Sequence, residues 1–192
     1  MFSDFSQSVD KTIGVPYEII RIDNSQNQYN ICEAYNKGKE MCKYELVCFS
    51  HEDIAFETNG WGNTLIHTFQ NPAIGLVGVL GICYLSLFPI RWLPDSECEG
   101  QFILNNTTYI RKRFPVNSTP EVVAVDGMFF CTRKSIIDKL RFSDDILKGF
   151  HGYDMDISFQ IRQQYKVVVT RNILLTHYSS GNFNQSYYDA MK

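Results

Sequence analysis

The sequence predicts an α/β fold, with a mostly parallel sheet flanked by helices. Short apolar runs alternate with amphipathic segments from residue 17 onward, which is the pattern of strands and helices in turn. Acidic or imidazole residues directly follow several of the apolar runs. The length of 192 residues, 44% of them hydrophobic, suits one domain with a substantial core. We therefore expect a single domain over residues 1–192.

The first part of the chain predicts a helix and then a strand–helix–strand unit. A short helix is expected over residues 5–13, where Gly14 would end it. Residues 17–22 are rich in aromatic and β-branched side chains and predict a strand, residues 28–42 an amphipathic helix, and residues 44–49 a buried strand. Because the connections are short, these two strands should be parallel, with a right-handed crossover.

The rest of the chain continues this alternation with one interruption. The expected elements are a helix at 61–69, a strand at 74–84, a strand at 121–131, helices at 135–140 and 154–164, a strand at 166–170 and a strand-like run at 173–177. Residues 86–120 break the order, because they contain four prolines and the basic run Arg111–Arg113. We expect an insertion of loops or a hairpin there.

Composition excludes several classes of function. The net charge of −3 argues against nucleic-acid binding, which needs a basic surface. The six cysteines include no C-x-x-C pair, so we expect reduced thiols packed in a cytoplasmic protein. Residues 1–15 lack the features of a signal peptide. The apolar passage 73–90 is interrupted by glycines and a proline and predicts no transmembrane segment. The run Arg111–Arg113 leaves peripheral contact with the inner membrane face open.

Several polar clusters end predicted strands or open predicted helices. They are Asp23-Asn24, His51-Glu52-Asp53, Asp126-Gly127, the segment Gly152–Asp156, and His177. In open α/β sheets ligands bind at the carboxyl ends of the strands, so several clusters should converge there. Carboxylates and imidazole at that edge suit a divalent cation and a phosphate-bearing substrate. Any one cluster is equally explained by a solvated loop or a helix N-cap, and the prediction depends on the whole set.

Six short motifs follow one another along the chain. They are I-D-N (22–24), A-Y-N-K-G (34–38), F-S-H-E-D-I (49–54), V-D-G-M-F-F (125–130), F-H-G-Y-D-M-D-I (150–157) and T-H-Y-S (176–179). Their order resembles that of the family-2-type glycosyltransferases of the GT-A fold, and most closely a small bacterial subgroup whose metal motif reads H-D/E-D. The resemblance covers residues 17–181 and implies a GT-A-like, Rossmann-like domain.

The resemblance implies a nucleotide-sugar glycosyltransferase of polysaccharide biosynthesis. Its donor would be a nucleotide sugar, with UDP-sugars ranked first, and its acceptor a glycan or a lipid-linked molecule. Mn²⁺ or Mg²⁺ would bridge the donor diphosphate, with Asp53 and His177 as its ligands. The nucleotide would be bound by Asp23, Asn24, Asn36, Gly38 and His51. The donor or acceptor sugar would lie near Asp126 and Gly127.

The chemistry of glycosyl transfer requires groups of these kinds. Charge builds on the departing diphosphate, and a divalent cation stabilises it as a Lewis acid. An acceptor hydroxyl is a poor nucleophile, so a carboxylate should remove its proton. The resemblance assigns this role to Asp154, and Asp156 is close enough to compete for it. If the base attacks no carbon, the anomeric configuration inverts. Trp61 is a candidate sugar contact, because sugars stack on aromatic faces, although its place at the head of an apolar helix face favours a core position.

Two features leave alternatives open. His51 stands where the family commonly has an acidic residue, and its imidazole would either bind the metal or hydrogen-bond ribose or phosphate. The family also normally opens with an apolar strand that forms one wall of the nucleotide pocket, and residues 1–7 contain no such run. The alternative function is therefore a non-catalytic protein that binds a nucleotide or a glycan. A nucleotidyltransferase is disfavoured, because no glycine-rich basic loop lies near the N-terminus.

Overall fold

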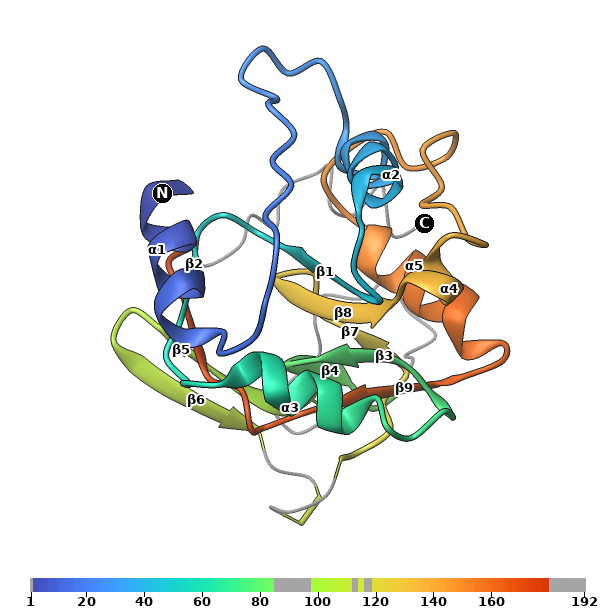
Figure 1. Cartoon of the computed structure of the whole chain (residues 1–192). Helices are drawn as coiled ribbons and strands as arrows, with labels where there is room; N and C mark the ends of the chain where they lie inside the picture. The colour runs from blue at the N-terminus through green and yellow to red at the C-terminus, as the bar shows by residue number, and fades with distance from the viewer. Residues whose placement is uncertain (1, 85–97, 112–113, 116–118, 180–192) are drawn as a thin grey trace.

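The computed structural model describes residues 2–84, 98–111, 114–115 and 119–179 (Figure 1). Its helices are α1 (Phe2–Thr12), α2 (Ile31–Met41), α3 (Trp61–Thr68), α4 (Lys134–Ile137) and α5 (Tyr153–Arg162). Its strands are β1 (Leu46–Ser50), β2 (Ile54–Phe56), β3 (Ile74–Gly78), β4 (Leu80–Ile82), β5 (Cys98–Leu104), β6 (Thr107–Arg111), β7 (Ala124–Val125), β8 (Phe129–Arg133), β9 (Lys166–Val169) and β10 (Leu175–His177). Most predicted elements are therefore present.

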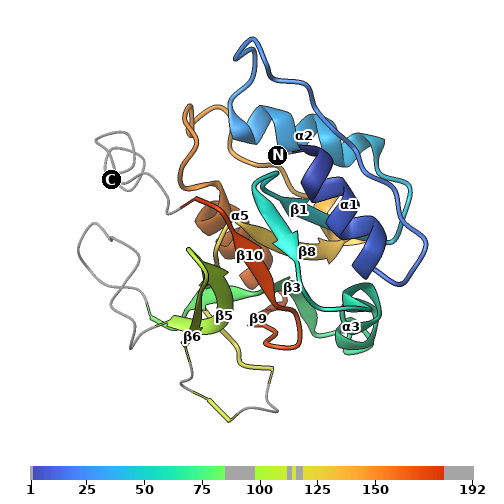
Figure 2. The ribbon, with the colours of Figure 1, turned by 90° about the vertical axis from the view of Figure 1, so that its left-hand side faces the viewer.

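A four-stranded sheet in the order β1-β8-β3-β9 divides the core into two parts. Successive residues of a strand point to opposite faces, and both faces of this sheet are covered. On one face, Phe49 and Phe130 stack with ring centroids 5.1 Å apart and pack with residues of α2, α4 and α5. On the other face, Phe129 and Val77 pack with residues of α1, α3 and β2. Figures 1 and 2 show α2 and α5 on one side of the sheet and α3 on the other.

The second sheet has the order β2-β10-β5-β4-β7, with β6 paired to β5. The α/β class is thus confirmed, but the strand pairing is mixed. Within the described ranges, only β3–β9 and β10–β5 are parallel, whereas the six other ladders are antiparallel. The β5–β6 pair is formed by a short hairpin return, which gives an antiparallel pair, whereas β1–β8, β3–β8 and β10–β2 join strands far apart in the sequence.

The prediction of a strand at 17–22 is wrong. Residues 15–23 are extended but join neither sheet, and no described residue bonds to their backbone through its own backbone. The predicted parallel pairing of this segment with residues 44–49 is therefore also absent. A β-branched sequence favours an extended chain, but a strand needs a neighbour at hydrogen-bonding distance. A cavity separates this segment from β1 instead.

Two long predicted strands are each divided in the structure. Residues 74–84 form β3 and β4, which belong to different sheets, and residues 121–131 form β7 and the start of β8. The chain bends at Val79, between the two strands, and at the neighbouring Gly78 a Cβ atom would lie 2.6 Å from a methyl carbon of Val125. A run that reads as one strand thus crosses from one sheet to the other beside this close contact.

The predicted insertion contains a hairpin. Strands β5 and β6 pair antiparallel, and Asn105 and Asn106 between them have φ angles of 50° and 60°. Two successive left-handed residues are typical of the type I′ hairpin turn. Residues 86–97 of the insertion and Lys112-Arg113 of the basic run lie outside the described residues. All six cysteines are free thiols. In the part of the chain that is described, no helix combines the length and the apolar character of a membrane span.

Candidate active site

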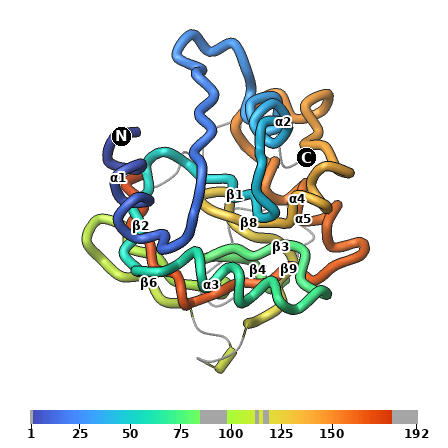
Figure 3. The backbone as a smooth tube through the Cα atoms, viewed as in Figure 1, coloured from blue at the N-terminus to red at the C-terminus, as the bar shows by residue number. Residues whose placement is uncertain are grey.

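A cavity of about 1980 Å³ lies beside the outer edge of β1. One wall is the extended segment 15–25, which rises between α1 and α2 in Figure 3. The opposite wall is residues 44–53, which include all of β1, and the loop 148–154 adds a further side. The cavity thus follows the strand end that carries the His51-Glu52-Asp53 motif.

His51, Asp53 and His177 form one cluster on the cavity wall. Strand β10 pairs with β2 so that His177 is opposite Ile54, and the Tyr178 N–H donates to the Asp53 carbonyl at 2.9 Å. This register brings together residues more than 120 positions apart. The Asp53 Oδ1 atom lies 3.5 Å from His177 Nε2 and 3.8 Å from His51 Nδ1.

The cluster has the composition and size of a divalent-metal site. Its three potential ligand atoms all lie within 4.8 Å of one another. Ligands bound to one ion at about 2.1 Å are about 3 to 4 Å apart, so a small closure would let all three bind. Hydrogen bonding from His177 holds the pKa of Asp53 well below its usual range, so its carboxylate is ionised. Burial lowers the pKa of His51, which favours the neutral imidazole that binds metals.

A second carboxylate group lies at the start of α5. Asp154 is 8% exposed, lines the cavity, and accepts hydrogen bonds from the N–H groups of Gly127 at 3.0 Å and Met155 at 2.9 Å. Asp126 lies on the same wall, and its Oδ1 accepts from the Met128 N–H at 2.8 Å. The structure thus brings the predicted Asp126-Gly127 and Asp154 motifs together, as expected from their places in the chain.

The surroundings of Asp154 keep its carboxyl group near the point of ionisation. Burial is the largest influence and raises its pKa, and the negative charge of Asp126 raises it further. Hydrogen bonds from Met155 and Gly127 act in the opposite direction. The result is a pKa of about 7. A carboxylate of this kind can accept a proton and release it again near neutral pH.

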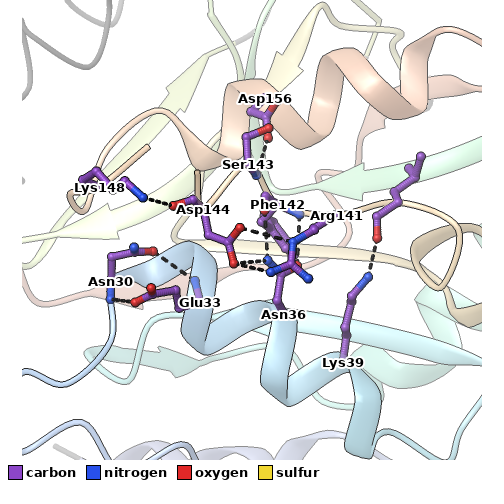
Figure 4. Close-up of polar contacts among 11 residues, drawn as sticks. Asn30, Glu33, Asn36, Lys39, Arg141, Phe142, Ser143, Asp144, Lys148 and Asp156 are labelled. Atoms are coloured by element: carbon purple, nitrogen blue, oxygen red, sulfur yellow. Dashed lines mark hydrogen bonds and ion pairs between the residues drawn. The ribbon is translucent and has the colours of Figure 1, made fainter. Parts of the chain in front are cut away.

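Two predicted site residues do not line the cavity. Asn36 exchanges hydrogen bonds with the backbone N–H and C=O of Phe142, and its amide also donates to Asp144. Asp156 accepts from the Ser143 N–H at 3.1 Å and from the Gln160 amide at 3.0 Å. Figure 4 shows both residues fastening the loop 141–144 to α2 and α5. These contacts hold the loop in place and leave both side chains outside the lining of the cavity.

The remaining predicted residues lie on the cavity wall and differ in exposure and in their hydrogen bonds. Asp23 is exposed and accepts from the Ser25 N–H, whereas the Asn24 amide bonds to both backbone groups of Tyr29 and closes a loop. Gly38 faces the wall from α2. Trp61 is 4% exposed and stacks on Phe56 with centroids 4.1 Å apart, which is a core environment.

Sequence reasoning gave no role to two aromatic residues beside the cluster. The Tyr153 hydroxyl lies 2.7 Å from His51 Nε2. The ring of Phe150, which is 55% exposed, lies 5.3 Å from the His51 ring between centroids. Both belong to the F-H-G-Y stretch that precedes Asp154. That aromatic run was the available signal, but nothing in it indicates a partner about 100 residues earlier.

Comparison with known proteins gives consistent results. The model of a family described as "Glycosyltransferase like family" matches residues 4–189. The streptomycin biosynthesis protein StrF of Streptomyces griseus is 21% identical over 165 residues, which are 83% of this chain and 57% of that protein. The chain therefore spans little more than half the length of this relative. The crystal structure of A197 from STIV superposes with a TM-score of 0.51 and 16% identity, over 93% of this chain and 78% of that one. This likeness agrees with a GT-A-like fold.

Proposed function

The chain belongs to the glycosyltransferase-like family whose model spans residues 4–189, and on that premise we propose that it is a metal-dependent, inverting glycosyltransferase. Family membership supports transfer from a nucleotide-sugar donor to an acceptor. The observation that carries the finer proposal is that the cluster of His51, Asp53 and His177 lines the same cavity as Asp154. One cavity thus contains a site for a cation that could bind the diphosphate of the donor and a candidate base for the acceptor.

The residues of the cavity can divide the reaction between them. Asp53 and His177 would hold a divalent cation, which would supply Lewis-acid stabilisation of the charge on the departing diphosphate. The bond from the anomeric carbon to the diphosphate oxygen breaks, and a bond from that carbon to the acceptor oxygen forms. The acceptor proton passes to a carboxylate oxygen of Asp154. Because Asp154 takes the proton and attacks no carbon, the anomeric configuration inverts.

Asp154 is preferred over Asp156 as the base for a geometric reason. Asp154 lines the cavity, whereas Asp156, two residues along the same helix, is occupied by Ser143 and Gln160. Asp154→Asn and Asp156→Asn are therefore a matched pair. We expect Asp154→Asn to lower transfer by about 10²–10⁴-fold, the usual contribution of a positioned base. Asp156→Asn should leave the rate within a few-fold of the wild type, and the reverse result would assign the base to Asp156.

Donor binding is tested separately from turnover. Calorimetric titration with UDP-, GDP- and dTDP-sugars, each with and without Mn²⁺, should give metal-dependent binding to one of them, UDP-sugars being the first choice. Release of the nucleoside diphosphate and the configuration of the product then report transfer and inversion. If no nucleotide sugar binds in a metal-dependent way, the proposal is wrong for this chain.

The acceptor and the place of action follow from the same proposal. We infer a glycan or a lipid-linked acceptor in the cytoplasm. The exposed Phe150 and Tyr178, at 55% and 63% exposure, offer aromatic faces to a sugar ring beside the metal cluster. Contact with the inner membrane face would suit a lipid-linked acceptor. Flotation with anionic vesicles tests that contact, and its absence would favour a glycan acceptor in solution.

A non-catalytic, nucleotide- or glycan-binding role is the second candidate. The observation that favours it is the cavity wall at residues 15–25, of which residues 15–23 make no backbone–backbone hydrogen bond to any described residue, so that a wide cavity remains. Under this alternative, a nucleotide sugar binds with Mn²⁺ but no diphosphate is released with any acceptor tested. Release that is lost in Asp154→Asn would exclude it.

A further inference from the structure

The contact between His51 and Tyr153 determines which nitrogen of the imidazole faces the metal cluster. His51 Nε2 lies 2.7 Å from the Tyr153 hydroxyl, and Nδ1 lies on the side of Asp53, 3.8 Å from Oδ1. The second distance is too long for a hydrogen bond. The Nε2 atom is therefore engaged by the protein, whereas Nδ1 faces the carboxylate without bonding to it.

A neutral imidazole carries its proton on one nitrogen only, so the partner of Nε2 decides the state of Nδ1. If Nε2–H donates to the Tyr153 oxygen, Nδ1 keeps the lone pair that a metal requires. The hydroxyl proton of Tyr153 then needs another acceptor. The Tyr35 side chain is the neighbour that can supply one, because its ring meets the Tyr153 ring edge to face with centroids 5.5 Å apart.

We propose that Tyr153 is a positioning residue that holds His51 with its proton on Nε2, so that Nδ1 becomes the third ligand of a cation of the first-row transition series. The site then has two imidazole nitrogens and one carboxylate oxygen, from His51, His177 and Asp53. Imidazole suits transition metals, whereas Mg²⁺ prefers an all-oxygen shell with several waters. The site therefore selects Mn²⁺ or a similar ion over Mg²⁺. This inference rests on the metal dependence proposed above and specifies its cofactor.

The Tyr153 hydroxyl is well placed for this role, because its position is fixed by packing. Tyr153 is 3% exposed and is the first residue of α5. Its ring lies so close to Gly127 that a Cβ atom there would be 2.0 Å from the Tyr153 oxygen. Partners of this kind orient metal-binding histidines, and their loss typically costs 10–100-fold in metal affinity.

The first experiment measures metal binding without any nucleotide sugar. Mn²⁺ and Mg²⁺ are titrated into the wild type, Tyr153→Phe and Tyr165→Phe, with calorimetry for both ions and the signal of free Mn²⁺ in electron paramagnetic resonance. Tyr165 is a half-buried tyrosine packed against Gly75 that does not line the cavity, and it serves as the matched control. We expect Tyr153→Phe to weaken Mn²⁺ binding by about 10–100-fold, Tyr165→Phe to leave it unchanged, and wild-type Mg²⁺ binding to be much weaker than Mn²⁺ binding.

The second experiment needs no variant that could fail to fold. Long-range ¹H–¹⁵N spectra of the wild type loaded with Zn²⁺, a diamagnetic probe, report the state of each ring nitrogen of the four histidines. The expected pattern for His51 is a protonated Nε2 and a metal-bound Nδ1. A protonated Nδ1, equal affinities for Mn²⁺ and Mg²⁺, or unchanged Mn²⁺ affinity in Tyr153→Phe would each overturn the proposal. Failure of sugar transfer would affect none of these readings, so the two proposals fail separately.

Discussion

At the scale of single residues, Asp154 shows how opposing influences decide the state of one carboxyl group. It lies in the first turn of α5, where the helix dipole favours negative charge, and two N–H groups donate to it. Burial and the neighbouring charge of Asp126 nevertheless outweigh these effects and raise its pKa to about 7. A group that is fully ionised in water is therefore half protonated here at neutral pH.

The first prediction concerns the pH dependence of transfer. The base is active only when ionised, so kcat/KM should rise with pH through about 7, the pKa of Asp154 in the folded protein. Asp154→Asn should lose this rise together with most of the rate. Initial rates between pH 5.5 and 8.5 at saturating Mn²⁺ measure the profile. A flat profile in the wild type would contradict the role of Asp154 as base.

The second prediction concerns stability. The pKa of Asp154 is higher in the folded protein, about 7, than the ordinary value of 3.8, so folding favours the protonated form. The resulting stabilisation is complete below about pH 4 and is lost as the pH rises through about 7. Roughly three pKa units correspond to roughly 4 kcal/mol. Urea unfolding at pH 5 and pH 8 should show a smaller loss of unfolding free energy in Asp154→Asn than in the wild type, and equal losses would contradict the assignment.

At the scale of elements, α2 depends on contacts that its own sequence does not reveal. Its start is predictable, because Asn30 and Glu33 form a capping box in which each side chain accepts from the other residue's N–H. Its attachment is not, because Asn36 binds Phe142 and Lys39 donates to the Ile137 carbonyl, about 100 residues away. The family resemblance implied a nucleotide contact for Asn36, whereas in the structure its side chain attaches α2 to the backbone of Phe142.

The third prediction tests that reassignment. Asn36→Ala leaves the buried N–H and C=O groups of Phe142 without their partner, which should lower the unfolding free energy by about 1–3 kcal/mol. Glu40→Ala, on an exposed position of the same helix, is the control. Urea unfolding measures both changes. If Asn36→Ala leaves stability unchanged but weakens nucleotide binding, the original interpretation of Asn36 is restored.

The elements that sequence could predict are those whose signals are local. Helices α1, α2, α3 and α5 and strand β1 were expected from periodicity and helix-ending residues, and each lies within a few residues of its predicted range. The segment 17–22 carries an equally clear strand pattern but joins no sheet. The residue pattern shows the conformational preference of one segment, whereas a ladder requires two segments at hydrogen-bonding distance. The division of residues 74–84 between sheets was hidden for the same reason.

In the candidate site, too, features with a local sequence signal were predictable, whereas contacts between distant segments were not. The common location of Asp53, His177, Asp126 and Asp154 on one cavity was predictable, because polar residues after apolar runs lie at strand ends and helix starts where ligands gather. The contact between Tyr153 and His51 joins residues 102 positions apart and depends on how β1 and α5 meet in space. No periodicity of either segment contains that information.

At the scale of the whole molecule, the cavity is bounded by parts of unequal stability. Strand β1 is paired to β8 along its length, whereas segment 15–25 on the opposite wall has hardly any backbone hydrogen bonds to the described residues. Amides without such bonds open at little cost in free energy. The wall that faces the metal cluster across the cavity is therefore the easier one to move.

The fourth prediction follows from this difference. In hydrogen–deuterium exchange, the amides of residues 15–23 should exchange within seconds, whereas those of β8 should be protected for much longer. Addition of a nucleotide sugar with Mn²⁺ should slow exchange in residues 15–23 and leave β8 unchanged. Protection of residues 15–23 without ligand would show that this wall is already held.

The position of β1 at the end of its sheet also affects how separate molecules meet. Among the described residues β1 pairs only with β8, so its outer N–H and C=O groups border the cavity. An unpaired edge of this kind is a template on which a strand of another chain can add. Concentrated solutions should therefore contain dimers joined through β1, and a ligand that fills the cavity should return them to monomers. Sedimentation velocity at several protein concentrations measures both effects. The association state of the protein should therefore depend on whether its substrate is bound.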